Sequence, residues 1–194
     1  LGGKSANIIF DDADFDRAVD GSLVNIFSNS GQICIAGSRI LVQRSIAARF
    51  VAAFVERTQA LKVGDPLDPA TEVGPMAFKT HWQRVLDHIE KAKLEGATLL
   101  CGGEPLTKLG DGYFVAPTVF QVNSNRLSLC QEEVFGPVVS IQIFDEDEEA
   151  FSLADDSRVG LAGYCWTNSL ARSQAFRQKV DARTLWVNTP LARD

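Results

Sequence analysis

The stretch NIIFDDADFDRAVDGSLVNIFSNSGQICIAGSRILVQ, residues 7–43, predicts a strand, a helix, a turn and a second strand in that order. The apolar run NIIF and the branched-chain run RILVQ are typical of short buried strands. Between them, apolar residues recur at helical spacing from Phe15 to Ile26, and the acids within residues 11–14 can cap and stabilise the helix start. Strands separated by a helix are the unit from which parallel sheets are built.

The same alternation continues to the end of the chain. Further strands are expected at ATLLC (97–101), FVAPTVFQV (114–122), VVSIQIF (138–144), LAGYCWT (161–167) and TLWVN (184–188). Further helices are expected from a cap at Ser45, over residues 82–92 with Gly96 as carboxy-terminal cap, after Asp145 and after Ser169. The pattern predicts an α/β fold whose largely parallel, twisted sheet carries helices on both faces.

Composition limits the classes of function. Of 194 residues, 45% are hydrophobic and 23% charged, which is typical of one folded domain with its own core. The formal net charge of −6 argues against a nucleic-acid surface. No apolar run approaches the ~20 residues that cross a bilayer, and the amino terminus lacks a signal-peptide pattern. We therefore expect a cytoplasmic protein that binds small molecules or other subunits, not a membrane.

The cysteine pattern argues against a metal site. The chain has four cysteines, Cys34, Cys101, Cys130 and Cys165, with no CxxC pair and no histidine at ligand spacing. In a chain of this length a disulfide framework is not expected, so the cysteines are interpreted as thiols in a reducing compartment.

Cys34 lies in GQICIAGSR (31–39), between Gly31 and Gly37. Glycines let the backbone bend sharply and let a ligand approach closely. A thiol on such a turn can act as a nucleophile, and its backbone N–H can stabilise an oxyanion. The residues alone leave a second interpretation open, because free cysteine is often buried and Ile33 and Ile35 are suited to a core.

The other candidate groups have structural interpretations. Cys101, Cys130 and Cys165 each lie in or beside an apolar run typical of a strand. His81 and His88 are seven residues apart on one helix face, where surface or packing roles are expected.

EEVFGPV (132–138) is, from its residues alone, a charged turn with Glu132 and Glu133 solvated, Phe135 in the core and Pro137 starting a strand.

Four segments resemble the aldehyde dehydrogenase family. GQICIAGSR resembles the segment with the pattern Gly-Gln-x-Cys-x-x-x-Arg that carries the family's catalytic cysteine. LGGKSANIIFDDAD resembles the opening of its catalytic domain, GYFVAPTVF its Gly-Tyr-Phe/Pro-Thr segment, and EEVFGPVVSIQIF its Glu-x-Phe-Gly-Pro motif. The resemblance covers nearly the whole chain and implies that residues 1–194 are the catalytic domain of such an enzyme.

The resemblance implies oxidation of an aldehyde to a carboxylic acid with NAD or NADP. Cys34 would attack the carbonyl, and the thiohemiacetal would become a thioester that water hydrolyses. Glu133 would hold the hydroxyls of the nicotinamide ribose, and Phe135 would pack beside that sugar. The general base would be a glutamate immediately before Leu1.

By the same resemblance, residues 1–194 lack the amino-terminal dinucleotide-binding domain and the carboxy-terminal oligomerisation strand, so they are expected to be inactive alone. The parent enzyme would be a homodimer or homotetramer. Arg193, after the last strand, could pair with the carboxylate of a semialdehyde substrate, although a solvent-facing Arg193 is the simpler interpretation.

Two other classes of function stay open. A nucleotide-independent cysteine hydrolase or acyltransferase would need a histidine on Cys34, for which the chain offers only His81 and His88. A non-catalytic interaction module of the same fold would need neither group. A nucleotide-binding assay on the longer gene product would separate these classes.

Overall fold

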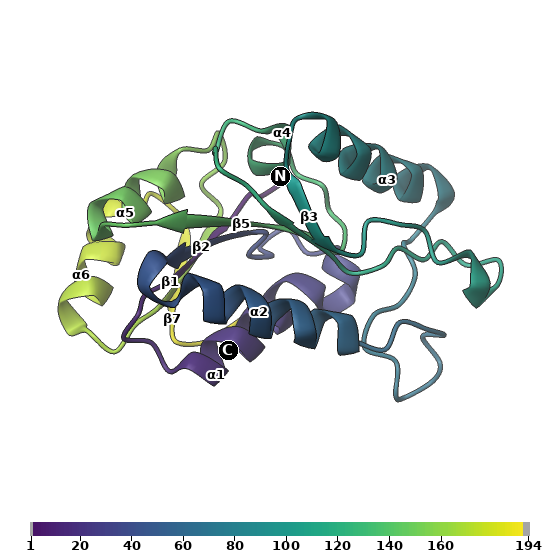
Figure 1. Ribbon diagram of the computed structural model, residues 1–194, viewed down its shortest axis with the longest axis horizontal. Helices are drawn as coiled ribbons and strands as arrows, with labels where there is room; N and C mark the ends of the chain where they lie inside the picture. Colours follow the sequence, from purple (N-terminus) through teal and green to yellow (C-terminus); the bar gives the residue numbers. More distant parts are fainter. Residues whose placement is uncertain (1, 192–194) are drawn as a thin grey trace.

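Seven strands form one sheet in the order β3-β4-β5-β2-β1-β6-β7 in the computed structural model, which describes residues 2–191 (Figure 1). All neighbouring strands are parallel except β3 and β4, which are antiparallel. The strands are β1 (Ala6–Ile9), β2 (Arg39–Gln43), β3 (Thr98–Cys101), β4 (Thr118–Gln121), β5 (Val138–Phe144), β6 (Ala162–Trp166) and β7 (Thr184–Val187). The predicted α/β class and each predicted strand are confirmed.

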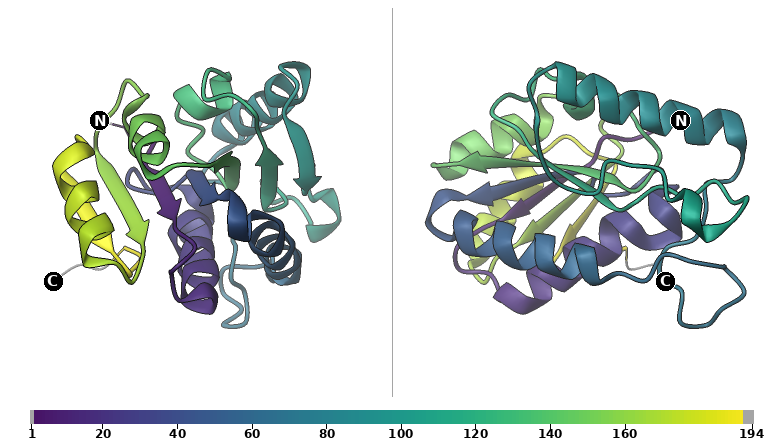
Figure 2. Two further views of the ribbon diagram at one scale, coloured as in Figure 1. Left: turned by 60° about the vertical axis from the view of Figure 1, so that its left-hand side comes forward. Right: turned by 45° about the vertical axis from the view of Figure 1, so that its right-hand side comes forward.

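Helices cover both faces of this sheet, as predicted (Figures 1 and 2). They are α1 (Phe15–Phe27), α2 (Arg44–Ala60), α3 (Lys79–Leu94), α4 (Ser128–Gln131), α5 (Asp147–Asp155) and α6 (Leu170–Lys179), with 3-10 turns η1 (Ser28–Gly31) and η2 (Thr107–Leu109). No helix within residues 2–191 is long and apolar enough to cross a membrane.

Alternation along the strands decides which helices each face meets. In β2, Ile40 and Val42 pack into the cluster that includes α1 and α2, whereas Leu41 packs with α5 and α6 on the other face. In β4, Val119 joins the first cluster, and Phe120 packs with α3. Successive side chains of a strand point to opposite faces, so these apolar runs contribute to the hydrophobic core on both faces of the sheet.

The helix ends agree with the predicted signals in two of three cases. Asp14 caps α1, because its carboxylate accepts a hydrogen bond from the backbone N–H of Arg17. Gly96 follows the end of α3 with a φ of +89°, the conformation that favours glycine. The predicted cap at Ser45 is wrong: α2 begins at Arg44, and the Ser45 hydroxyl instead hydrogen-bonds the carboxylate of Asp11.

The parallel strands also bring distant loops to one edge. The segments before β1, β2 and β5 are residues 2–5, 32–38 and 132–137, and all three lie at the amino ends of neighbouring parallel strands. These segments contain the predicted site residues.

Candidate active site

Cys34 lies on an exposed turn between α1 and β2. Just before it, Asn29, Ser30 and Gly31 have φ values of 50°, 57° and 72°. Glycine and asparagine tolerate this left-handed conformation, but at Ser30 it costs roughly 1–2 kcal/mol, so the surroundings must hold the bend. The chain then turns over residues 33–36, where the N–H of the last residue donates to the first carbonyl at 3.1 Å.

Exposure separates Cys34 from the other three thiols. Cys101, Cys130 and Cys165 are buried, and burial raises the pKa of each, to about 12 for Cys165. The thiolate is the reactive form, so burial keeps these three unreactive. A core position for the Cys34 thiol is therefore wrong, although the neighbouring Ile33 does pack against the core.

Two buried side chains hold the backbone after Cys34. The hydroxyl of Tyr164, in β6, donates to the carbonyl of Ile35 at 2.8 Å. The side-chain oxygen of Asn25, in α1, accepts from the N–H of Gly37 at 3.1 Å. The loop is thus bonded to a helix and a strand that precede and follow it in sequence, and it carries the thiol on a supported backbone.

The backbone N–H of Cys34 donates to no acceptor within residues 2–191. Such a donor beside a nucleophile is suited to stabilise the oxygen that becomes negative when a carbonyl is attacked. Cys34 therefore combines an exposed thiol with a backbone N–H that no acceptor within residues 2–191 occupies.

The turn before β5 packs directly on the cysteine loop. A Cβ atom added at Gly31 would lie 2.1 Å from the carbonyl oxygen of Gly136. A Cβ atom added at Gly136 would lie 2.8 Å from a methyl group of Val85, in α3. Glycine at both positions lets the cysteine loop, this turn and α3 stack closely.

The segment before β1 joins Cys34 to Glu133. The N–H of Gly3 donates to Glu133 Oε1 at 3.0 Å, across 130 positions of sequence. A Cβ atom added at Gly3 would lie 2.1 Å from the carbonyl oxygen of Cys34. The structure thus brings two of the predicted site residues close to one glycine.

Phe135 lies in the same turn but not in the core, where the residues alone had suggested it. Its side chain is 37% exposed, and its φ is +56°, an uncommon conformation for a bulky residue. Its carbonyl oxygen lies 2.7 Å from Nε2 of His81, whose ring centroid is 5.9 Å from that of Phe135.

Sequence reasoning did not include His81, Tyr164 or Asn25 in the site. His81 was expected to be a surface or packing residue. Helical spacing places it on a face of α3 but cannot identify what that face touches. Asn-Ser-Gly before the cysteine was a usable signal for the left-handed bend, because asparagine and glycine tolerate it.

Glu133 and Phe135 are suited to hold the sugar of a nucleotide. Both side chains are exposed. A carboxylate accepts hydrogen bonds, which sugar hydroxyls donate, and an aromatic ring offers an apolar surface beside the sugar. Metal ligation is not supported, since residues 2–191 contain no group of three His, Cys, Asp or Glu side chains that could hold an ion.

Arg39 is a buried cation beneath these loops, and burial lowers its pKa to about 10. Its guanidinium donates to the side chain of Asn125 and to the carbonyl oxygens of Lys4, Leu153 and Ala154. Two of these carbonyls belong to the last turn of α5, where backbone acceptors lack helical partners. Arg39 therefore joins the amino ends of β1 and β2 to α5.

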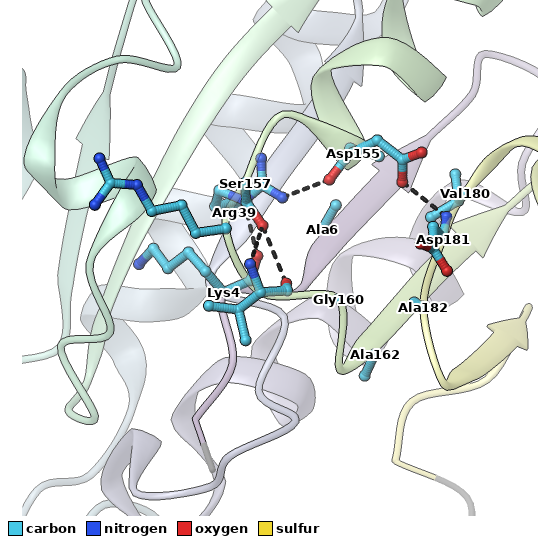
Figure 3. Close-up of a pocket in the computed structure, with 13 residues that line it drawn as sticks. Lys4, Ala6, Arg39, Asp155, Ser157, Gly160, Ala162, Val180, Asp181 and Ala182 are labelled. Carbon is cyan, nitrogen blue, oxygen red and sulfur yellow. Dashed lines mark hydrogen bonds between the residues drawn. The ribbon is translucent and has the colours of Figure 1, made fainter.

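Lys4 is a second buried cation, only 1% exposed, and burial lowers its pKa to about 8. Its ammonium group has no hydrogen-bond partner among residues 2–191. Its stem lines a cavity of about 260 Å³ that lies beside Arg39 (Figure 3). In that view the ammonium points away from Asp155 and Asp181 on the far side of the cavity, so Lys4 does not pair with them.

Two expectations fall outside the described residues. Leu1, before which the general base was expected, and Arg193, with its expected substrate contact, are both outside residues 2–191. Both stay predictions.

Comparison with known proteins gives a consistent set of relatives. The model of the aldehyde dehydrogenase family matches residues 1–194. A betaine aldehyde dehydrogenase of Rhizobium etli is 44% identical over 190 residues, which are 97% of this chain and 39% of that protein.

Solved structures agree with this result. HpcC from Thermus thermophilus and the betaine aldehyde dehydrogenase of Staphylococcus aureus in complex with NAD+ are each 42% identical, with a TM-score of 0.97. Each match covers 100% of this chain and 39% of the other. The chain thus spans about two fifths of the length of these relatives.

Proposed function

The chain belongs to the aldehyde dehydrogenase family, and we propose that its parent protein oxidises an aldehyde to a carboxylic acid with NAD or NADP. Residues 1–194 are the catalytic domain in this proposal; the dinucleotide-binding domain and the oligomerisation strand lie elsewhere in the parent. The observation that carries it is the exposed Cys34 thiol on a loop packed against the turn that presents Glu133 and Phe135.

Cys34 is the nucleophile. Its thiolate forms a C–S bond to the aldehyde carbon, and the carbonyl oxygen takes up the negative charge near the backbone N–H of Cys34. The cofactor, when bound, supplies the acceptor for the hydride that leaves this carbon. The product on Cys34 is a thioester. Water then adds to it and loses a proton to a base, and cleavage of the C–S bond releases the acid and the thiol.

Glu133 and Phe135 bind the reactive half of the cofactor. The Glu133 carboxylate accepts hydrogen bonds from ribose hydroxyls, and its Oε1 is already oriented by the N–H of Gly3. The Phe135 ring packs beside the same sugar. Since Gly3 also contacts the carbonyl of Cys34, the cofactor end and the nucleophile share one backbone support.

The same proposal covers partners and location. The parent binds a small aldehyde and forms a homodimer or homotetramer, and it resides in the cytoplasm, where free thiols persist. Relatives named betaine aldehyde dehydrogenases make a quaternary-ammonium aldehyde one candidate substrate, beside a carboxylated semialdehyde.

A nucleotide-independent hydrolase fits this structure less well. Such an enzyme needs a histidine bonded to its cysteine. Nε2 of His81 instead contacts the carbonyl of Phe135, and His88 lies 3.9 Å from Glu132. Neither histidine is paired with Cys34.

The test uses the full-length parent protein. Reduction of NAD and of NADP is followed with betaine aldehyde, a carboxylated semialdehyde and an uncharged aldehyde of similar length. Brief alkylation and mass mapping should label Cys34 before the three buried cysteines, and bound cofactor should change its labelling rate. Aldehyde turnover without either nucleotide, or preferential labelling of Cys101 or Cys165, would contradict the proposal.

A further inference from the structure

We propose that His81 is a positioning residue, whose ring nitrogen holds the carbonyl of Phe135 and thereby fixes the turn that presents Phe135 and Glu133 to the cofactor. The effect of this contact on the reaction rests on the proposed function. The contact itself is a feature of this chain, and it lies outside the pattern by which Glu133 and Phe135 were identified.

The contact determines which ring nitrogen of His81 carries a hydrogen. Nε2 of His81 lies 2.7 Å from the carbonyl oxygen of Phe135, which is a short hydrogen-bond distance. A carbonyl oxygen can only accept, so Nε2 must carry the hydrogen. Neutral His81 is therefore the Nε2–H tautomer, and the protonated ring makes the same bond because both its nitrogens carry hydrogen.

The turn needs such a support because its backbone is strained. Phe135 has a φ of +56°, where a bulky side chain is a genuine outlier. Residues kept in such regions persist only when their neighbours over-determine the conformation. The hydrogen bond acts on the peptide immediately after the strained Cα, where it opposes relaxation of the turn.

One face of α3 supplies this support at two points. His81 contacts the carbonyl of Phe135, and Val85, one helical turn further, packs against Gly136. The carbonyl group of Gly136 also meets Gly31 of the cysteine loop. The strained turn is thus held between α3 and the loop that carries Cys34.

The His81 ring is itself oriented by aromatic neighbours. Its centroid lies 5.7 Å from that of Phe78 and 5.9 Å from that of Phe135, both in tilted arrangements. Packing on two sides restricts the ring, so Nε2 stays directed at the carbonyl. The same contact with Phe135 limits rotation of the ring that packs beside the ribose.

The consequence is specific to the nicotinamide end of the cofactor. The other half of the nucleotide would bind to the dinucleotide domain, away from the turn that His81 contacts. Loss of the hydrogen bond should therefore weaken cofactor binding only slightly but misplace the hydride acceptor, and small displacements are costly for rate. We expect kcat to fall about 10-fold while the Kd for the cofactor rises about threefold.

The experiment compares His81→Gln, His81→Asn and His81→Leu in the full-length enzyme. Glutamine can place its amide N–H close to the position of Nε2, whereas asparagine is one methylene shorter and leucine has no donor. His81→Gln should keep kcat within about twofold of the native value, and the other two should show the full loss. His88→Gln, on the same helix and beside Glu132, is the matched control and should leave kcat and Kd unchanged.

A second measurement needs no turnover. Hydrogen exchange of residues 132–138, followed by mass spectrometry on the cofactor-free enzyme, should be faster in His81→Asn and His81→Leu than in the native protein and His81→Gln. In a Phe135→Ala background, His81→Leu should add little further loss of kcat, because the two residues act as one unit. If His81→Leu fails to fold, the Gln and Asn pair decides.

The outcomes separate this inference from the proposed function. If the native enzyme neither binds NAD or NADP nor oxidises aldehydes, the proposed function fails, and the exchange experiment still tests the support of the turn. If the native enzyme is active and His81→Asn matches His81→Gln in kcat, Kd and exchange, His81 does not position the turn and the inference is overturned.

Discussion

The two edges of the sheet differ in how their polar groups are satisfied. At the carboxyl ends of β1 and β6, Arg172 is bonded to Asp11, Asp12 and Asp147 at 2.8, 3.0 and 2.8 Å. Thr167 also donates to Asp12. At the amino ends, the Lys4 ammonium has no partner within residues 2–191, and Ser30 and Phe135 have left-handed backbones.

This difference indicates which edge of the sheet is suited to a reaction. Open α/β sheets usually bind ligands outside the carboxyl ends of their strands. Here that edge is occupied by a paired charge cluster, while the exposed thiol and the left-handed residues near it, Ser30 and Phe135, lie at the amino ends. Asn188, after β7 at the carboxyl ends, also has a left-handed backbone, but its side chain is bonded to the backbone of Thr167. Strain of this kind is characteristic of active sites, and the paired edge contributes stability instead.

Removal of the nucleophile should have the largest effect. Cys34→Ser in the full-length enzyme should lower kcat at least about 10³-fold, because a hydroxyl is a much weaker nucleophile than a thiolate. Steady-state cofactor reduction measures the loss, and cofactor binding should be retained. Cys101→Ala, at a buried thiol in β3, which β4 and β5 separate from β2, is the control and should keep activity within about twofold. Comparable losses for both variants would contradict the role of Cys34.

A methyl group at Gly31 should come next. Gly31→Ala places a Cβ atom 2.1 Å from the carbonyl of Gly136 at a φ of +72°, so the cysteine loop and the neighbouring turn must separate. We expect a loss of kcat of about 10²-fold.

Gly96→Ala is the matched control for strain without a clash. Its φ is +89°, but an added Cβ atom would meet nothing within 4 Å. It should cost about 1 kcal/mol of stability and leave kcat unchanged. Full activity of Gly31→Ala would mean that the contact between the loop and the turn is dispensable.

Lys4→Met should stabilise the protein near neutral pH. Burial lowers the pKa of Lys4 to about 8, below the value of about 10.4 in an unfolded chain. The folded state therefore disfavours the charged form, and this penalty is complete below pH 8 and vanishes as the pH rises to about 10.4. The gain should be on the order of 2–3 kcal/mol at pH 7 and should shrink above pH 8.

Thermal unfolding midpoints between pH 7 and pH 10 measure this trend in the full-length enzyme. Lys108→Met, at an exposed lysine, should show no such pH dependence. A Lys4→Met variant that is less stable than the native enzyme at every pH would mean that the ammonium has a partner in the remainder of the parent protein.

Arg172→Leu should have a smaller effect, and on stability alone. It leaves three carboxylates without their shared cation, which should cost about 1–2 kcal/mol because the cluster is partly exposed. Arg44→Leu breaks a fully exposed pair with Asp145 and should leave stability almost unchanged, because water screens such a pair. Both variants should keep kcat, and a large loss of kcat in Arg172→Leu would show that the two edges are coupled.

The pKa of Asp12 sets the pH below which the effect of Arg172→Leu on stability should shrink. Partial burial raises its pKa, but hydrogen bonds from Thr167 and Arg172 outweigh burial, and the net pKa lies below its ordinary value. A lowered pKa stabilises the folded state above the unfolded value of about 3.9, and this contribution is lost as the pH falls through the folded pKa. The stability difference between Arg172→Leu and the native enzyme should therefore narrow only in acid.

The amino-acid sequence was sufficient to predict the local elements and the candidate residues of the site. Period-two and helical spacing predicted each strand and the long helices, because the side chains that face a core repeat with the geometry of the element. The segment around Cys34 could be identified since its glycines, its cysteine and its resemblance to the family are contiguous. Glu133 and Phe135 were predicted for the same reason.

The contacts between distant elements could be known only from the folded structure. Local periodicity says that a side chain faces inward or outward but not which distant residue it contacts. The bond from Gly3 to Glu133 spans 130 positions, and that from His81 to Phe135 spans 54. Such contacts depend on strand order and on the packing of α3 against the turn. Both are set by the apolar surface that the whole sheet and its helices bury together. The exposure of Cys34 was decided in the same way, whereas the apolar runs around Cys101, Cys130 and Cys165 had already predicted the structural positions that these thiols occupy.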